Sequence, residues 1–310
     1  MRYSNILDAI GHTPLVEMAH LSPSRRVRLF AKLEGHNPTG SVKDRIARSM
    51  IESAEASGEL RPGMAILEST SGNTGISLAM VGRLKGYRVC AVMPDNLTPE
   101  RSELLELFGA EIVYSPGAEG PNGAIRVAEE LAAAGAYFHA FQYGNPANPR
   151  AHYETTGPEI LADLPSVDAF VAGLGTGGTL MGVARRLKEH NPRVQIVAAE
   201  PLPGEAVQGL RSLEEGFTPP ILDPALLDHK ILVSNHNSVV GVRLLAEREG
   251  IFAGVSSGAN LHVALRIARD MERGNIVVLM PDGGWKYVSA KLWTRDLPEL
   301  AEAMEGAIWW

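Results

Sequence analysis

The sequence predicts an α/β protein of two lobes, each built on a mostly parallel sheet covered by helices. Three observations lead to this class. The chain has 310 residues, enough for two lobes. Short apolar or β-branched runs alternate with longer segments of helical periodicity, and glycine-rich turns lead from strands into helices. Strands that alternate with helices form a parallel sheet with helices on both faces.

The expected strands are short and apolar. They cover residues 27–33, 65–70, 88–93, 111–114, 137–142, 169–174, 195–199 and 275–280. The expected helices cover residues 43–57, 74–84, 99–108, 123–133, 179–189, 239–249 and 259–272. Thr98 followed by Pro99 marks one helix start, because threonine is a good N-cap and proline suits the first helical position. The turn-rich stretch 143–149 predicts the boundary between the lobes, with the site between them.

Composition excludes several classes of protein. The net charge is −7 and no dense basic cluster is present, which argues against nucleic-acid binding. No apolar run is long enough to span a bilayer and the N-terminus lacks an export signal, so we expect a cytoplasmic protein. The single cysteine, Cys90, lies in an apolar run and is expected to be an inert core thiol. The scattered histidines predict no catalytic metal.

The chemistry of the sequence centres on Lys43, in the stretch Asn37-Pro-Thr-Gly-Ser-Val-Lys-Asp-Arg45. A lysine at a helix start is usually solvated. However, its amine can form an imine with an aldehyde. The glycine-rich turns 69–75 and 175–179 each precede a helix, where anionic groups bind. Together these features predict a phosphorylated aldehyde that is held covalently.

The glycine pattern also has a second interpretation. Gly173-Leu-Gly-Thr-Gly-Gly178 satisfies a dinucleotide-binding pattern, and Glu200 ends the next strand, where a ribose-binding acid would lie. An NAD-dependent dehydrogenase is therefore an alternative, although it leaves Lys43 and the Asn73 loop without a role. Turn 69–75 itself is either a carboxylate site or an ordinary capped turn that uses Ser71 or Asn73.

Gly254-Val-Ser-Ser-Gly258 matches a nucleophile elbow formally. A hydrolase of that type needs an acid and then a histidine later in the chain. The only later histidine, His262, lies six residues after Ser256 in the same expected helix. We therefore reject acyl transfer.

Four motifs then occur in one order. They are Asn37-Pro-Thr-Gly-Ser-Val-Lys-Asp-Arg45, Thr70-Ser-Gly-Asn-Thr-Gly75, Gly175-Thr-Gly-Gly-Thr179 and Gly254-Val-Ser-Ser-Gly258. With them the chain resembles a cysteine synthase of the β-family of pyridoxal-phosphate enzymes (fold type II, tryptophan synthase β-like). The resemblance extends from Gly11 to Tyr287. It implies the cofactor pyridoxal 5'-phosphate, a smaller mobile lobe over 38–142, and a larger lobe over 1–37 and 143–310 that carries the cofactor-phosphate loop and the C-terminal tail.

The resemblance implies a role for each motif residue. Lys43 would form the imine and then remove the α-proton, Asn73 would contact the cofactor's phenolic oxygen, and Ser256 would meet its pyridine nitrogen. The phosphate would be held by Gly175, Thr176, Gly177, Gly178 and Thr179, and the substrate carboxylate by Thr70, Ser71, Thr74 and Gln142. Because a neutral hydroxyl beside the ring nitrogen makes the ring a weaker electron sink, β-elimination through an aminoacrylate is favoured.

The segment 208–217 resembles the branch that uses O-phosphoserine, in which an arginine, here Arg211, binds the substrate phosphate. The alternative is that Arg211 pairs with Glu214 or Glu215 on the surface. The aromatic end of the chain, residues 305–310, also resembles that branch. Two positions depart from the expected pattern: Ser69 stands where the family often has proline, and Gly177 stands where the O-phosphoserine branch more often has threonine.

The expected reaction is therefore a β-replacement that makes L-cysteine from an O-activated serine, with O-phosphoserine favoured. The sulfur donor is sulfide or a thiocarboxylated ubiquitin-like carrier protein, and the resemblance implies a homodimer. An O-acetylserine sulfhydrylase and a cystathionine β-synthase-like enzyme are the alternatives within the family. Outside it, the alternatives are the dehydrogenase and a non-catalytic partner protein.

Overall fold

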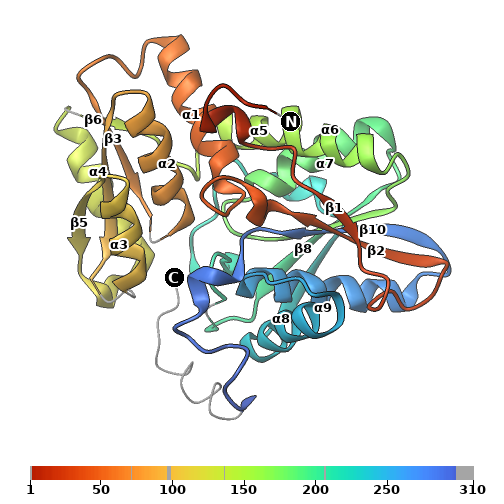
Figure 1. Cartoon of the computed structure of the whole chain (residues 1–310). Helices are drawn as coiled ribbons and strands as arrows, with labels where there is room; N and C mark the ends of the chain where they lie inside the picture. Colours follow the sequence, from red (N-terminus) through yellow and green to blue (C-terminus); the bar gives the residue numbers. More distant parts are fainter. Residues whose placement is uncertain (1, 71, 96–98, 136, 206, 298–310) are drawn as a thin grey trace.

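The computed structural model describes residues 2–70, 72–95, 99–135, 137–205 and 207–297, which form two sheets flanked by helices (Figure 1). The larger sheet has the strand order β1-β2-β10-β7-β8-β9 and the smaller one β5-β4-β3-β6. All the strand pairs described are parallel except β1 with β2, which confirms the predicted α/β class.

The larger sheet consists of β1 (Leu15–Glu17), β2 (Val27–Leu33), β7 (Ala169–Gly173), β8 (Gln195–Pro201), β9 (His229–Val233) and β10 (Gly274–Met280). Its two faces carry alternate residues of each strand, as a pleated strand requires. In β10, Val278 packs under α8 (Asn235–Glu249) and α9 (Val255–Asp270). Its neighbour Val277 packs against α7 (Gly178–His190) on the other face. Both faces are therefore covered (Figure 1).

The smaller sheet consists of β3 (Ala65–Ser69), β4 (Arg88–Pro94), β5 (Glu111–Ser115) and β6 (Tyr137–His139). One face packs on α1 (Lys43–Ser57), α2 (Asn73–Leu84) and α3 (Pro99–Leu107), and the other on α4 (Gly120–Ala133). Cys90 of β4 is buried and free in the second of these clusters, which confirms the expected core thiol.

Several elements differ from the predicted ranges. β6 ends at His139 rather than at residue 142, because Phe141 has a φ of 44° and turns the chain out of the sheet. The strands β1 and β9 were not predicted. α5 (Ala147–Ala151) begins inside the expected boundary turn 143–149. It continues through a π-helical turn (His152–Thr156) into α6 (Gly157–Asp163). Pro146 and Pro158 fit there because each lies at the start of a helix.

Short 3-10 turns complete the described structure at Ile6–Ala9, Glu34–His36, Gly117–Glu119, Leu213–Glu215, Pro224–Leu226 and Gly284–Tyr287. Within the described ranges, no helix is both long enough and apolar enough to cross a membrane.

Candidate active site

A cavity of about 170 Å³ lies where strands of both sheets end. Its walls include Ser69 and Pro94, at the carboxyl ends of β3 and β4, and Gly173, at the carboxyl end of β7. Ligands of α/β proteins bind at such edges. The cavity brings together Lys43, Thr70, Asn73, Thr74, Gln142, Gly175, Thr176, Gly177, Gly178, Thr179, Arg211 and Ser256. Ser71, the remaining predicted site residue, lies outside the described residues.

Lys43 is the first residue of α1, and its backbone N–H donates to Ser41 Oγ at 3.3 Å. Its side chain is half-buried and lines the cavity. Burial lowers the pKa of Lys43, and the negative charge of Asp282 opposes this in part. A lower pKa increases the fraction of neutral amine, the form that forms an imine or accepts a proton.

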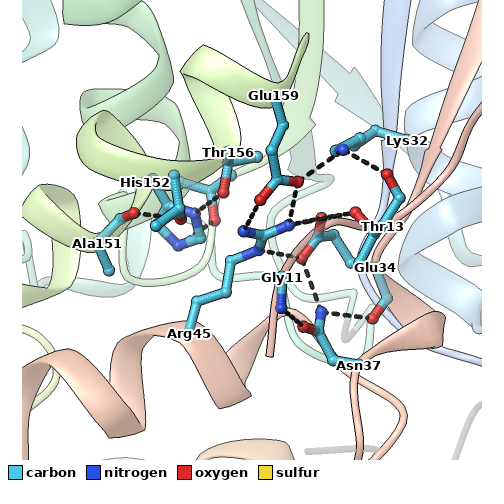
Figure 2. A network of polar contacts seen from close by, with 12 residues as sticks. Gly11, Thr13, Lys32, Glu34, Asn37, Arg45, Ala151, His152, Thr156 and Glu159 are labelled. Atoms are coloured by element: carbon cyan, nitrogen blue, oxygen red, sulfur yellow. Dashed lines mark hydrogen bonds and ion pairs between the residues drawn. The ribbon is translucent and has the colours of Figure 1, made fainter. Parts of the chain in front are cut away.

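A buried ion cluster anchors the start of α1 (Figure 2). The guanidinium of Arg45 lies between two carboxylates, at 2.7 Å from both Glu34 and Glu159. Lys32, whose side chain is fully buried, donates to Glu159 and to the carbonyl of Thr13. Burial alone would raise the pKa of each carboxyl, but the cations outweigh it and lower the pKa of Glu34, and that of Glu159 to about 2. Arg45 lies two residues after Lys43, so this cluster fixes the helix that presents the amine.

The turn before α7 has the shape of an anion cradle. Gly177 precedes the helix with a φ of 84° and has no side chain to cap it, while Thr176 Oγ1 accepts the backbone N–H of Gly178 at 3.3 Å. A Cβ added to Gly178 would lie 1.8 Å from Asn148 Oδ1, and one added to Gly175 would lie 2.6 Å from the carbonyl oxygen of Gly209. The turn therefore requires glycine, and its residues 175–179 line the cavity at the start of a helix. A phosphate group fits this arrangement.

Two side chains from the helical stretch that begins with α5 support the cradle. Asn148 Nδ2 donates to Thr176 Oγ1 at 3.1 Å. His152 Nε2 lies 3.2 Å from Thr179 Oγ1, and its Nδ1 lies 2.9 Å from Thr156 Oγ1. Burial, and next the positive charge of Arg45, lower the pKa of His152 to about 3, so this ring is neutral at physiological pH. No local pattern predicted a role for either residue, because Asn148 lies in the expected boundary turn and His152 in a helical segment that was not predicted.

The start of α2 brings together three of the predicted carboxylate contacts. Thr70 Oγ1 accepts the backbone N–H groups of Gly72 and Gly75, each at 3.3 Å, and so caps the turn. Thr74 Oγ1 donates to Gln142 Oε1 at 2.7 Å. A helix N-terminus with these hydroxyl and amide groups suits a small carboxylate.

Asn73 forms hydrogen bonds with two side chains that the sequence patterns did not predict. Its Nδ2 donates to Asp282 Oδ2 at 2.9 Å, and its Oδ1 accepts from Lys286 Nζ at 2.5 Å. Tyr287 donates to the same Asp282 oxygen at 2.7 Å. The family resemblance extends into the segment 282–287 but implies no role for its side chains. Its side chains hold Asn73 in place at the N-terminus of α2.

The dinucleotide interpretation fails at Glu200. This carboxylate is fully buried, where it accepts the backbone N–H of Leu213 at 2.8 Å and pairs with Lys230 at 2.9 Å. Because its oxygens already pair with protein groups in the interior, it is not available to bind a ribose. Ser256 instead lies in the first turn of α9 and faces the same cavity as Lys43, although 213 residues separate them in sequence.

Arg211 lies between two aromatic rings at one side of the cavity. Its guanidinium carbon is 4.7 Å from the ring centre of Phe217 and 5.3 Å from that of Tyr143. Nη2 donates to Asn122 Oδ1 at 3.2 Å, whereas Nη1 is buried without a hydrogen-bond partner. Among the ion pairs of the described ranges, none joins Arg211 to Glu214. A buried cation with a free donor suits an anionic ligand.

Lys43, the glycine-rich turn before α7 and the start of α2 together form a site that suits a phosphorylated aldehyde cofactor. Comparison with known proteins supports this cofactor. The chain belongs to the family of pyridoxal-phosphate dependent enzymes, whose family model matches residues 6–282. It is 43% identical to a cysteine synthase of Staphylococcus aureus, covering 94% of this chain and 97% of that protein.

Two further relatives support the same family. Cysteine synthase B of Pseudomonas aeruginosa is 43% identical, with 94% of this chain and 97% of that protein covered. The crystal structure of a cysteine synthase from Entamoeba histolytica superimposes with a TM-score of 0.90 at 36% identity, covering 99% of this chain and 96% of that one. The protein is therefore a pyridoxal-phosphate dependent enzyme of fold type II.

Proposed function

We propose that the protein is a cysteine synthase that replaces the β-substituent of an O-activated serine with sulfur, and that its preferred substrate is O-phosphoserine. The observation that carries the substrate choice is Arg211, whose buried Nη1 lacks a hydrogen-bond partner at the wall of the cavity. An unpaired guanidinium N–H in a buried site is costly unless an anion binds it. A phosphate leaving group provides that anion, whereas an acetyl group does not.

In this proposal each group of the chain has one task. Thr70, Thr74 and Gln142 bind the substrate carboxylate at the start of α2. The neutral amine of Lys43, favoured by burial, accepts the α-proton at Nζ. Pyridoxal phosphate, when bound through the cradle before α7, supplies the aldehyde for the imine and a ring that withdraws electrons from the α-carbon.

The test compares kcat/KM for O-phosphoserine and O-acetylserine with sulfide as the second substrate. We expect O-phosphoserine to be preferred, and Arg211→Ala to lower its kcat/KM by about 10- to 100-fold, since a hydrogen bond to a charged group contributes about 1.5–3 kcal/mol. O-acetylserine should lose less than about threefold. Arg25→Ala, which removes an exposed arginine, is the control of equal charge. Equal losses on both substrates would contradict the phosphoserine preference and favour an O-acetylserine sulfhydrylase.

The sulfur donor and the assembly belong to the same proposal. A thiocarboxylated ubiquitin-like carrier protein is the proposed alternative to free sulfide, and a higher rate with the carrier than with equimolar sulfide would support it. We propose further that the enzyme works as a homodimer in the cytoplasm. Sedimentation of the purified protein tests the dimer. Absence of turnover with both O-activated serines would instead indicate a non-catalytic partner protein.

A further inference from the structure

A carboxyl group lies behind the substrate side of the cavity, at the end of β3. Glu68 is fully buried. Carboxyl side chains are rarely buried in a strand without a cation partner, and none of the ion pairs in the described ranges involves Glu68. A fully buried group of this kind needs a structural or functional reason.

The polar partner of Glu68 is the turn that follows β6. Its Oε2 accepts the backbone N–H of Gln142 at 3.2 Å, while Oε1 is buried without a partner. Phe141 precedes this N–H with a φ of 44°, a conformation that a residue with a side chain seldom adopts. The amide of Phe141 and the side chain of Gln142 also act on the carboxyl. Glu68 therefore holds a turn whose backbone conformation is unfavourable by itself.

The same turn presents its other side to the cavity. The side chain of Gln142 accepts from Thr74 Oγ1 at 2.7 Å and lies 3.5 Å from the carbonyl oxygen of Ser69. Both Gln142 and Thr74 line the cavity. Glu68 thus contacts the backbone of Gln142 from the protein interior, and Gln142 lines the cavity.

We propose that Glu68 is a positioning residue, which holds the backbone of Gln142 and so fixes the Gln142–Thr74 pair where the substrate carboxylate binds. This inference rests on the proposed function, in which the pair contacts the carboxylate of an amino-acid substrate. Glu68 itself is not among the residues that line the cavity.

The protonation state of Glu68 gives the inference a measurable signature. Burial raises the pKa of Glu68 to about 8, and the hydrogen bonds from Gln142 oppose this only in part. At neutral pH the group is an uncharged acid, so no negative charge lies behind the carboxylate site. Above that pKa the new carboxylate repels the substrate carboxylate and weakens its binding.

Among the residues that the structure describes, Tyr143 is an electrostatic neighbour of this carboxyl, and the Arg211 guanidinium carbon lies 5.3 Å from the centre of the Tyr143 ring. Burial raises the pKa of Tyr143. His139 pairs with Leu67 in the sheet and therefore points to the opposite face. The alkaline change is thus assigned to Glu68 itself.

The kinetic test compares Glu68→Ala and Glu68→Gln with the wild type in the cofactor-loaded enzyme, using both O-activated serines because they share the carboxylate. Glu68→Ala should raise KM about tenfold, with kcat within about threefold. Glu68→Gln keeps an acceptor for the Gln142 N–H and should stay within about twofold at neutral pH. Glu106→Gln, at an exposed position of α3, is the control.

The pH dependence provides the second readout. The KM of the wild type should rise above about pH 8 relative to that of Glu68→Gln. Lys43 and the substrate amine titrate in both proteins, so the ratio of the two KM values isolates Glu68. Two results would overturn the inference: a ratio of the two KM values that does not change with pH, or a KM of Glu68→Ala equal to that of the wild type.

Hydrogen exchange separates this inference from the proposed function. Glu68→Ala should accelerate amide exchange in residues 140–145, because the turn loses the group that holds the Gln142 N–H. This measurement needs no turnover. If the wild type does not turn over either serine derivative, the proposed function fails. Amide exchange then still reports whether Glu68 stabilises the backbone of Gln142. Unchanged exchange in these residues would overturn the positioning role.

Discussion

Arg45 donates two hydrogen bonds of 2.7 Å to the carboxylate of Glu159, which lies 114 residues later in the chain. Arg45 belongs to α1, which begins at Lys43, and Glu159 belongs to α6, which covers the larger sheet. The helix that begins at Lys43 is therefore tied to the larger sheet through a buried, bidentate ion pair.

Glu159→Gln should destabilise the protein by about 3 kcal/mol near pH 7, because it leaves Arg45 and Lys32 as buried cations without their shared carboxylate. The pKa of Glu159 in the folded protein is about 2, below its ordinary value of 4.5. A lowered pKa gives stability that is present above the ordinary value and is lost as the pH falls towards the folded value. The difference from the wild type should therefore shrink between about pH 4.5 and pH 2.

Chemical unfolding at several pH values checks this expectation. Glu154→Gln, whose side chain is 59% exposed and close to only one arginine, is the matched control and should change little. A difference between Glu159→Gln and the wild type that does not depend on pH would contradict the linkage.

His152→Ala should weaken binding of pyridoxal phosphate about 10-fold, because the hydroxyl of Thr179 loses the ring that orients it. Since the pKa of His152 is about 3, its ring stays neutral, and the loss should be the same from about pH 6 to pH 9. Titration of the apoenzyme with the cofactor, followed by absorbance, measures this. Tyr153→Phe alters the adjacent side chain and should bind as the wild type does; a loss that grows with falling pH would point to a charged ring.

Lys43→Ala should lower turnover by more than about 1,000-fold, because the chain then lacks both the imine-forming amine and the base. Borohydride should fix the cofactor to the wild type at Lys43, as mass spectrometry of the digested protein would show. In Lys43→Ala no cofactor should be fixed. Attachment at another lysine would remove Lys43 from this role.

Glu68→Gln should also change stability, in the opposite sense to Glu159→Gln. The pKa of Glu68 is raised from 4.5 to about 8 on folding. Stability from such a group is present below the ordinary value and is lost as the pH rises through the folded value. Glu68→Gln has no such loss, so its melting temperature should exceed that of the wild type increasingly between about pH 5 and pH 8. A constant difference over this range would contradict the raised pKa.

The parts of the fold that could be predicted are those that a short stretch of chain determines. The strand–turn–helix units around Lys43, Asn73 and Gly177 have their glycines, caps and apolar runs within about 20 residues, which local patterns reveal. The helix over His152–Thr156 was missed because two prolines and two asparagines between 145 and 149 suggested a turn. Tertiary packing overrides such local preferences.

The supporting residues of the site could not be predicted for a different reason. Asn73 meets Asp282 across 209 residues, and Gln142 meets Glu68 across 74. No periodicity or spacing encodes such a contact. Only the folded chain brings these residues together. The family motifs contain the expected ligand contacts, and most of the residues that support those contacts lie outside the motifs.

The loop that carries Arg211 has its own support. Glu200 and Lys230 hold it from the larger sheet, through the N–H of Leu213. The amine at residue 43 depends on different contacts, those of the ion cluster around Arg45. Under the proposed function, changes in loop 208–217 should therefore alter which leaving group is accepted while the contacts that hold Lys43 stay intact. This makes the loop a natural target for engineering enzymes that make unusual amino acids.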